Sequence, residues 1–123
     1  MENVLVVEDE ANIRKLVAVN LASRGYQVAE AQNGTEALAH LRKKAPSLMV
    51  LDIKLPDFTG WELLKKINRD PNLALSFPVL IMTASITEAV VDLDTFPSVT
   101  DVLIKPFSTG KLVSAVERAL GHR

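Results

Sequence analysis

The amino-acid sequence predicts a doubly wound α/β sandwich, in which helices cover both faces of a parallel β-sheet. Short apolar runs recur along the chain, without the polar alternation that is typical of half-exposed strands. Segments with apolar residues at helical spacing separate these runs. The five predicted strands cover residues 4–7, 26–30, 47–51, 78–82 and 102–104.

The composition is that of one ordinary globular domain, and we expect a single domain over residues 1–123. The formal charge is -1 and no basic tract occurs, so nucleic acid and anionic membranes are not expected as partners. The absence of cysteine excludes disulfides and thiolate sites. The sequence contains no signal-like start and no apolar run of about 20 residues, so we expect a cytoplasmic protein.

The first predicted strand, 4–7, ends in acidic residues, and a helix over 11–23 follows it. Gly25 is a typical residue just beyond the end of such a helix. The apolar residues at helical spacing in this segment are Ile13, Leu16, Val17 and Leu21.

The next strand, 26–30, leads through an Asn33-Gly34 turn into a helix around 36–41. Two lysines and Pro46 end that helix. The strand at 47–51 is almost wholly apolar and ends at Asp52, where turn residues follow at once.

The second half of the chain predicts three more helices and two strands. A helix over 60–69 buries Leu63, Leu64 and Ile67. The strand at 78–82 precedes a short helix over 87–94 with Thr87 as its N-cap. After the strand at 102–104, Ser108 or Thr109 caps the last helix, whose buried residues are Leu112, Val113, Val116 and Leu120.

Five strands alternating with five helices fit the flavodoxin-like strand order 2-1-3-4-5. The chain is short for the six-stranded dinucleotide-binding fold, and its first turn has no Gly-x-Gly-x-x-Gly. In such sheets the binding site lies outside the carboxyl ends of the strands, where the winding reverses between the first and third strands.

Chemically active side chains follow four of the predicted strands. They are Glu8 and Asp9, then Asp52, Thr83 and Lys105. Three carboxylates in one cleft repel each other, and a hard divalent cation relieves that repulsion. Mg²⁺ prefers oxygen ligands, whereas the sulfur or paired imidazoles that zinc favours are missing here.

A site of this kind suits phosphoryl transfer, which needs mainly positioning and charge neutralisation. Asp52 is the candidate nucleophile and would form an acyl phosphate. Lys105 offers a positive charge for one phosphate oxygen, and the Thr83 hydroxyl offers a hydrogen bond to another.

These residues resemble the receiver domain of two-component response regulators, over the chain from 4 to about 120. The motifs are Glu8-Asp9 after an apolar strand, Asp52-x-x-x-Pro56-x-x-x-Gly60, Thr83-Ala84 and Lys105-Pro106-Phe107. The resemblance implies Mg²⁺-dependent phosphorylation of Asp52 by a histidine kinase or a histidine phosphotransfer protein. It implies Asp9 and Asp52 as direct metal ligands, Glu8 as a ligand through water, and the Lys54 carbonyl as a further ligand.

The resemblance also implies a cis bond between Lys105 and Pro106. The sequence departs from the family at Val102, where an aromatic residue is usual, and the segment 94–100 lacks the usual Gly-Ala. This departure concerns how phosphorylation is read out, not the chemistry at Asp52.

The predicted function is a stand-alone receiver that, once phosphorylated, docks onto a downstream effector protein, as in a phosphorelay. Its product is a modified form of itself, so we do not expect an enzyme. The first alternative is a receiver excised from a longer DNA-binding regulator or a hybrid histidine kinase. Others are a phosphatase or phosphotransferase with an aspartyl intermediate, disfavoured by Lys54, and a degenerate scaffold.

Simpler interpretations exist for single residues. Asp52 and Asp57 could be turn residues, and Glu8 and Asp9 could serve as N-cap and first-turn acids of the first helix. Thr83 could be only a strand former and Lys105 only a solvated cation. The remaining expectations are solvent-facing His40 and His122, core-filling Met49 and Met82, and Trp61 as a packing residue.

Overall fold

The structure, a computed structural model, describes residues 2–73, 76–87 and 95–122. Its elements are β1 (Asn3–Val7), α1 (Ala11–Ala22), β2 (Gln27–Ala31), α2 (Gly34–Lys43), β3 (Leu48–Asp52), α3 (Gly60–Arg69), β4 (Val79–Thr83), β5 (Val99–Ile104) and α5 (Thr109–Ala119). The five strands form one parallel sheet in the order β2-β1-β3-β4-β5. The predicted flavodoxin-like sheet and its strand order are confirmed.

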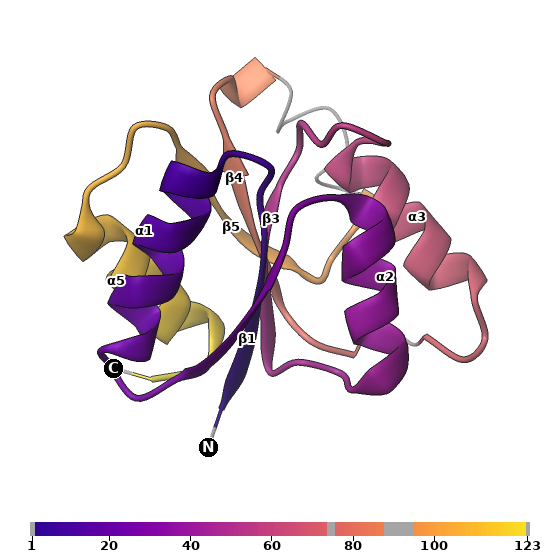
Figure 1. The fold of residues 1–123 in the computed structure, drawn as a ribbon, viewed down its shortest axis with the longest axis horizontal. Helices are drawn as coiled ribbons and strands as arrows, with labels where there is room; N and C mark the ends of the chain where they lie inside the picture. The colour runs from indigo at the N-terminus through magenta and orange to yellow at the C-terminus, as the bar shows by residue number, and fades with distance from the viewer. Residues whose placement is uncertain (1, 74–75, 88–94, 123) are drawn as a thin grey trace.

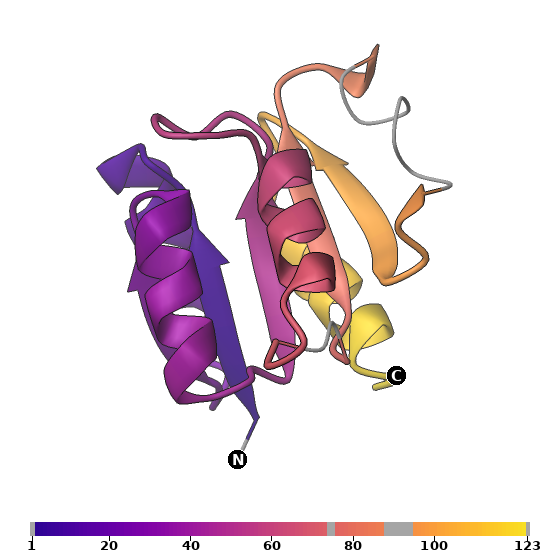
Figure 2. The ribbon, with the colours of Figure 1, turned by 90° about the vertical axis from the view of Figure 1, so that its right-hand side faces the viewer.

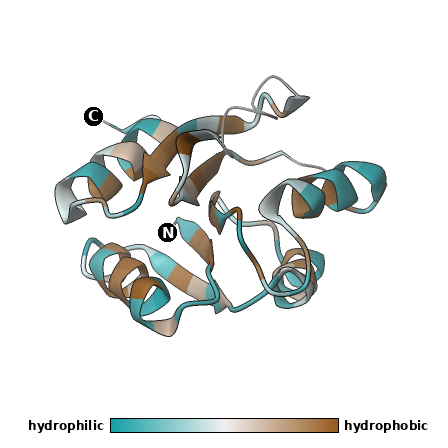
Figure 3. Cartoon of the chain, turned by 90° about the horizontal axis from the view of Figure 1, so that it is seen from above, coloured by the Kyte–Doolittle hydropathy of each residue, from teal (hydrophilic) through white to brown (hydrophobic). Residues whose placement is uncertain are grey.

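The sheet lies between two layers of helices. Figure 1 shows α1 and α5 on one face and α2 and α3 on the other. Figure 2, turned by 90°, shows α2 and α3 in front of the strands. Figure 3, seen from above, shows mainly hydrophobic strands between the helix layers. None of the helices in the described ranges is long and apolar enough to cross a membrane.

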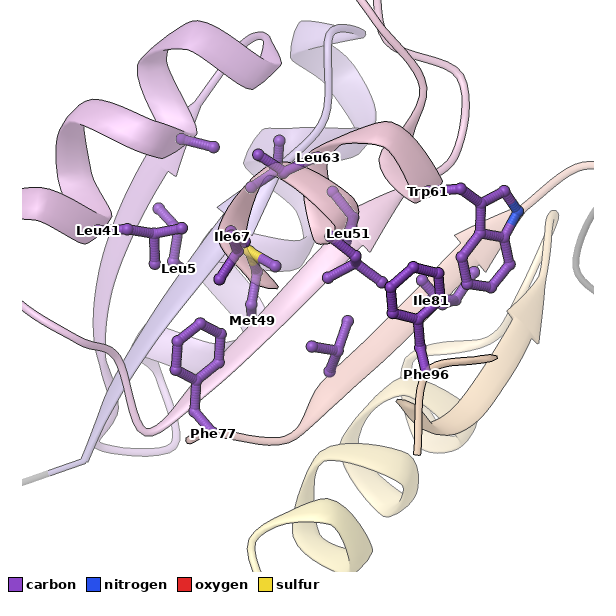
Figure 4. Close-up of a cluster of buried hydrophobic side chains, with 14 of the residues drawn as sticks. Leu5, Leu41, Met49, Leu51, Trp61, Leu63, Ile67, Phe77, Ile81 and Phe96 are labelled. Atoms are coloured by element: carbon purple, nitrogen blue, oxygen red, sulfur yellow. The ribbon is translucent and has the colours of Figure 1, made fainter. Parts of the chain in front are cut away.

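Alternate residues of the central strands feed two separate cores, because successive side chains of a strand point to opposite faces. Leu5 and Leu51 pack with α2 and α3, whereas Val6 and Val50 pack with α1 and α5. Figure 4 shows the first of these cores, in which Trp61 and Phe96 lie side by side. The sheet is therefore held firmly on both faces, and its strand ends form a rigid edge.

Several expectations from sequence need correction. Strand β5 begins at Val99, three residues before the predicted start, and both edge strands are only partly buried. Leu16 fits the apolar face that the sequence predicts for the first helix, but it is 51% exposed because it lies on the side of α1 away from the sheet. Leu120 is only partly buried. Residues 86 and 87 are helical, so Thr87 lies inside the helix and not at its N-cap, and the rest of the helix predicted over 87–94 lies outside the described part of the chain.

The helix ends follow local side-chain chemistry. Ser108, one of two predicted caps, accepts a hydrogen bond from the Lys111 backbone N–H and begins α5. Thr59 and Glu62 form a reciprocal capping box at the start of α3. The N-cap of α1 is Glu10, without a side-chain cap bond, so Glu8 and Asp9 do not cap that helix.

The loop between β3 and α3 is tied to the start of α2. Asp57 accepts hydrogen bonds at 2.8–2.9 Å from the backbone N–H groups of Gly34 and Thr35 and from the Thr35 hydroxyl. The Phe58 ring lies over Gly34, where an added Cβ would overlap it. The sequence predicts Asp57 as a turn residue that lies close enough to affect the loop, but it does not predict the contact with α2. Because it bonds to α2, it also fixes the loop that follows Asp52.

Gly60 allows α3 to begin directly against the end of β3. A Cβ added at Gly60 would lie 2.7 Å from the Asp52 carbonyl oxygen and 3.1 Å from the Ile53 Cα. Both neighbours are backbone atoms, so neither can yield by a side-chain rotation. Glycine is therefore required here by close approach.

We predict that Gly60→Ala lowers the free energy of unfolding by about 1–3 kcal/mol, since the new methyl group overpacks against backbone. Gly110→Ala is the matched control, because its Cβ would meet only the Ser108 Oγ at 3.9 Å. That control should change stability by no more than about 1 kcal/mol. Urea unfolding followed by circular dichroism measures both, and equal effects would show that the close approach at Gly60 costs nothing.

The hydrogen bonds to Asp57 predict a contribution to stability that depends on pH. Burial acts to raise the pKa of Asp57, but the hydrogen bonds from Gly34, Thr35 and Phe58 outweigh it and lower the pKa to about 2, from an ordinary 3.8. A depressed folded-state pKa means that the contribution is present above about pH 4 and is lost as pH falls toward about 2. The stability difference between wild type and Asp57→Asn should therefore shrink over that range in urea titrations. A constant difference would contradict the assigned hydrogen bonds.

Candidate functional site

The candidate site lies at the carboxyl ends of the central strands. Val7 of β1 pairs with Leu51 of β3, so the next residues, Glu8 and Asp52, reach the same level of the sheet. Carboxylate oxygens of Glu8, Asp9 and Asp52 all lie within 4.8 Å of one another. The predicted meeting of three acidic side chains is confirmed.

Lys105 completes this cluster from the end of β5. Its Nζ lies 2.6 Å from Glu8 Oε1 and 2.9 Å from Asp52 Oδ2. The Lys105 backbone N–H donates to the Thr83 carbonyl at 2.8 Å, which continues the β4–β5 ladder by one residue. The bond between Lys105 and Pro106 is cis, as the resemblance implied.

Burial and neighbouring charges shift the pKa values of Glu8 and Lys105. Burial raises the pKa of Glu8 to about 7, Lys105 opposes the shift, and Asp52 adds to it. Burial acts to lower the pKa of Lys105, but its bonds to Glu8 and Asp52 raise that pKa above the usual value. One ammonium therefore balances only part of the negative charge that three ionised carboxylates would carry.

The donor set fits a hard divalent cation such as Mg²⁺. Glu8 and Asp52 are buried and Asp9 is exposed, so the cluster has a solvated side that can leave water on a metal ion. All three residues offer carboxylate oxygen, and the described residues place no imidazole among them. This chemistry suits Mg²⁺ better than zinc.

Asp52 is held at both carboxylate oxygens. Oδ1 accepts a hydrogen bond from the Lys54 backbone N–H at 3.2 Å, and Oδ2 accepts one from Lys105. Asp52 is 5% exposed, so water has little access to its carboxylate. The Lys54 carbonyl as a metal ligand stays a prediction.

Thr83 lies at the end of β4 and is buried, but its hydroxyl is engaged locally. Its Oγ1 accepts a hydrogen bond from the Ser85 backbone N–H and donates one to the Ser85 carbonyl, both at 3.1 Å. The predicted hydrogen bond from Thr83 to a phosphate would require the hydroxyl to give up its bond to the Ser85 carbonyl.

The structure adds a residue that the sequence reasoning missed. Arg14 of α1 is buried, and it bonds to Glu30 of β2 and to the Glu8 backbone carbonyl. A signal was available, because Arg14 precedes Val17, Ala18 and Leu21 at the spacing of the buried helix face. A charge on such a face needs a partner.

The remaining predictions are confirmed for the core residues and only in part for the histidines. Met49 and Met82 are fully buried and Trp61 packs in the core, as predicted. His122 is exposed, but it contacts the Glu2 carboxylate, and His40 is only partly exposed. Val102 packs against the cluster that contains Trp61 and Phe96.

Comparisons with known proteins agree with this geometry. The family model of the response regulator receiver domain matches residues 4–117. The chain is 34% identical over 119 residues to the phosphate regulon transcriptional regulatory protein PhoB of Pseudomonas aeruginosa, covering 97% of this chain and 52% of that protein. It is 39% identical over 125 residues to the DNA-binding transcriptional regulator NtrC of Salmonella typhimurium, covering 97% and 25%.

The chain thus spans about half the length, or less, of these curated relatives. Among solved structures, the chemotaxis response regulator CheY4 of Vibrio cholerae matches with a TM-score of 0.86 and 30% identity, over 98% of this chain and 99% of that chain. Since the family model covers nearly the whole fold, this chain belongs to the response regulator receiver domains, whose members work as phosphorylation-controlled switches.

Proposed function

We propose that Asp52 accepts a phosphoryl group, with Mg²⁺ bound beside it, from a histidine kinase or a histidine phosphotransfer protein. The observation that carries this proposal is the buried Asp52 carboxylate between Lys105 and the two acidic residues that follow β1. Receiver domains bind Mg²⁺ at an acidic pocket, and the donor set here fits that ion. Glu8, Asp9, Asp52 and the Lys54 carbonyl are the proposed ligands, directly or through water.

The proposed transfer is a displacement at phosphorus. An Asp52 carboxylate oxygen forms the new P–O bond while the P–N bond to the donor imidazole breaks, and the electron pair of that bond returns to the imidazole nitrogen. Bound Mg²⁺ supplies neutralisation of charge on the phosphoryl oxygens. Lys105, which already lies 2.9 Å from Asp52 Oδ2, moves its ammonium to one of those oxygens.

The modified chain is itself the product, so we propose a switch rather than an enzyme with a separate substrate. Phosphorylation changes the surface near the strand ends, and a downstream protein binds the changed surface. Receiver domains in general work as switches of this kind.

A second candidate is a receiver that regulates a DNA-binding portion of a longer chain. The observation that favours it is the partial coverage of curated relatives, which are transcriptional regulators about twice as long. The size of the endogenous protein on an immunoblot distinguishes the two.

We expect wild-type protein incubated with acetyl phosphate and Mg²⁺ to gain the mass of one phosphoryl group. Asp52→Asn removes the nucleophile, so that variant should gain none, and wild type in chelator should also gain none. Intact-mass spectrometry measures all three. Labelling of the Asp52→Asn variant at the wild-type level would show that another residue accepts the phosphoryl group.

We expect Lys105→Ala to keep or increase Mg²⁺ affinity, because the ammonium that competes for Glu8 and Asp52 is removed. The same variant should accept phosphate about tenfold more slowly or worse, since charge on the phosphoryl oxygens loses a partner. Isothermal titration with Mg²⁺ and intact-mass time courses give the two results. A loss of metal affinity would contradict the role assigned to Lys105.

A further inference from the structure

A buried arginine connects α1 to the first of the acidic residues. The Arg14 side chain is 11% exposed, and its Nε donates to Glu30 Oε1 at 3.1 Å. One terminal nitrogen, Nη1, donates to the Glu8 backbone carbonyl at 2.9 Å. The guanidinium therefore joins β2, α1 and the end of β1 through one rigid planar group.

Glu8 is restrained at its backbone and at both side-chain oxygens as a result. Its backbone N–H donates to the Ala31 carbonyl at 3.0 Å, and its carbonyl accepts from Arg14. Its side-chain oxygens accept from Lys105 at 2.6 Å and from the Glu10 backbone N–H at 3.2 Å. The Glu8 carbonyl is part of the peptide group between Glu8 and Asp9. The hydrogen bond from Arg14 therefore restrains that peptide group.

We propose that Arg14 is a positioning residue for the acidic site, with Glu30 as the anchor that orients its guanidinium. The inference rests on the proposed function of Asp52 and deepens it. Arg14 bonds to the Glu8 backbone and to Glu30, not to the side-chain carboxylates of the metal site. It acts by setting the plane of the peptide that precedes Asp9, and so the direction from which the Asp9 carboxylate meets Glu8 and Asp52.

The physical consequence is preorganisation of the metal site. Three carboxylates repel each other, and a backbone free to rotate would relax by moving the exposed Asp9 carboxylate away from Glu8 and Asp52. Part of the binding free energy of a cation would then be used to bring the carboxylates together, and its affinity would be lower. Groups that orient metal ligands without touching the metal commonly contribute about tenfold or more to metal affinity.

Lys15 provides a matched control, because it binds the same carboxylate without reaching the site. Its Nζ lies 3.0 Å from Glu30 Oε2, and its side chain is 63% exposed. Lys15→Met thus removes an ion pair to Glu30 and leaves the Glu8 carbonyl contact intact. Arg14→Lys keeps the charge, but one ammonium lacks the fork that spans Glu30 and the Glu8 carbonyl.

The test is Mg²⁺ affinity of the unphosphorylated protein by isothermal titration, for wild type, Arg14→Gln, Arg14→Lys, Glu30→Gln and Lys15→Met. We expect about tenfold weaker binding for Arg14→Gln, partial recovery in Arg14→Lys, and an intermediate loss in Glu30→Gln. Lys15→Met should stay within about twofold of wild type. Glu30→Gln keeps the proposal testable if the buried Arg14 variants do not fold, since circular dichroism identifies unfolded samples.

Phosphorylation by acetyl phosphate gives a second readout. Arg14→Gln should need about tenfold more Mg²⁺ for half-maximal rate, while its rate at saturating Mg²⁺ approaches that of wild type. A merely structural role would lower stability and leave this Mg²⁺ dependence unchanged. A folded Arg14→Gln protein with wild-type Mg²⁺ affinity overturns the role of Arg14 alone. Wild type that neither binds Mg²⁺ nor gains a phosphoryl group overturns the proposed function as well.

Discussion

Three carboxylates and one ammonium at the end of a parallel sheet are the constraint on which the rest of this molecule depends. The pairing of Val7 with Leu51 brings Glu8 level with Asp52, and the extension of β5 brings Lys105 to both. Their close approach is unfavourable in water-poor surroundings unless a cation shares the charge. Lys105 supplies one positive charge, and burial first, with Asp52 adding to it, still raises the pKa of Glu8 above its ordinary value although Lys105 opposes the shift.

Carboxylates that repel each other stay close together only if the surrounding fold holds them in place. Two cores hold the sheet from both faces, so the strand ends cannot separate without exposing apolar surface. The loops beyond the strands have their own restraints: Asp57 ties the loop after Asp52 to the start of α2, and Gly60 lets α3 start against the end of β3. The site is thus fixed by the packing of the sheet and by hydrogen bonds from neighbouring helices.

The sequence predicted those features that depend on local pattern. Apolar periodicity located the central strands and α3, and an acidic or basic residue directly after a strand pointed to the site edge. Contacts between distant segments have no such local signal. The bonds of Asp57 to Gly34 and Thr35, and of Arg14 to Glu30, join residues whose proximity only the completed sheet creates. Likewise, Leu16 fits a helical apolar pattern, yet it lies on the exposed face, because periodicity alone does not fix the width of the buried stripe.

The departure at residue 102 has a structural counterpart on the face of the sheet that α2 and α3 cover. Val102 packs against the core that contains Trp61 and Phe96, whose rings stack with centroids 5.7 Å apart. If the Thr83 hydroxyl donated a hydrogen bond to a phosphoryl oxygen, its bond to the Ser85 carbonyl would break, since one hydroxyl has a single proton to donate. Ile86 follows the turn at 83–85 directly and is 64% exposed, so an apolar side chain lies on the surface next to the Thr83 hydrogen bonds.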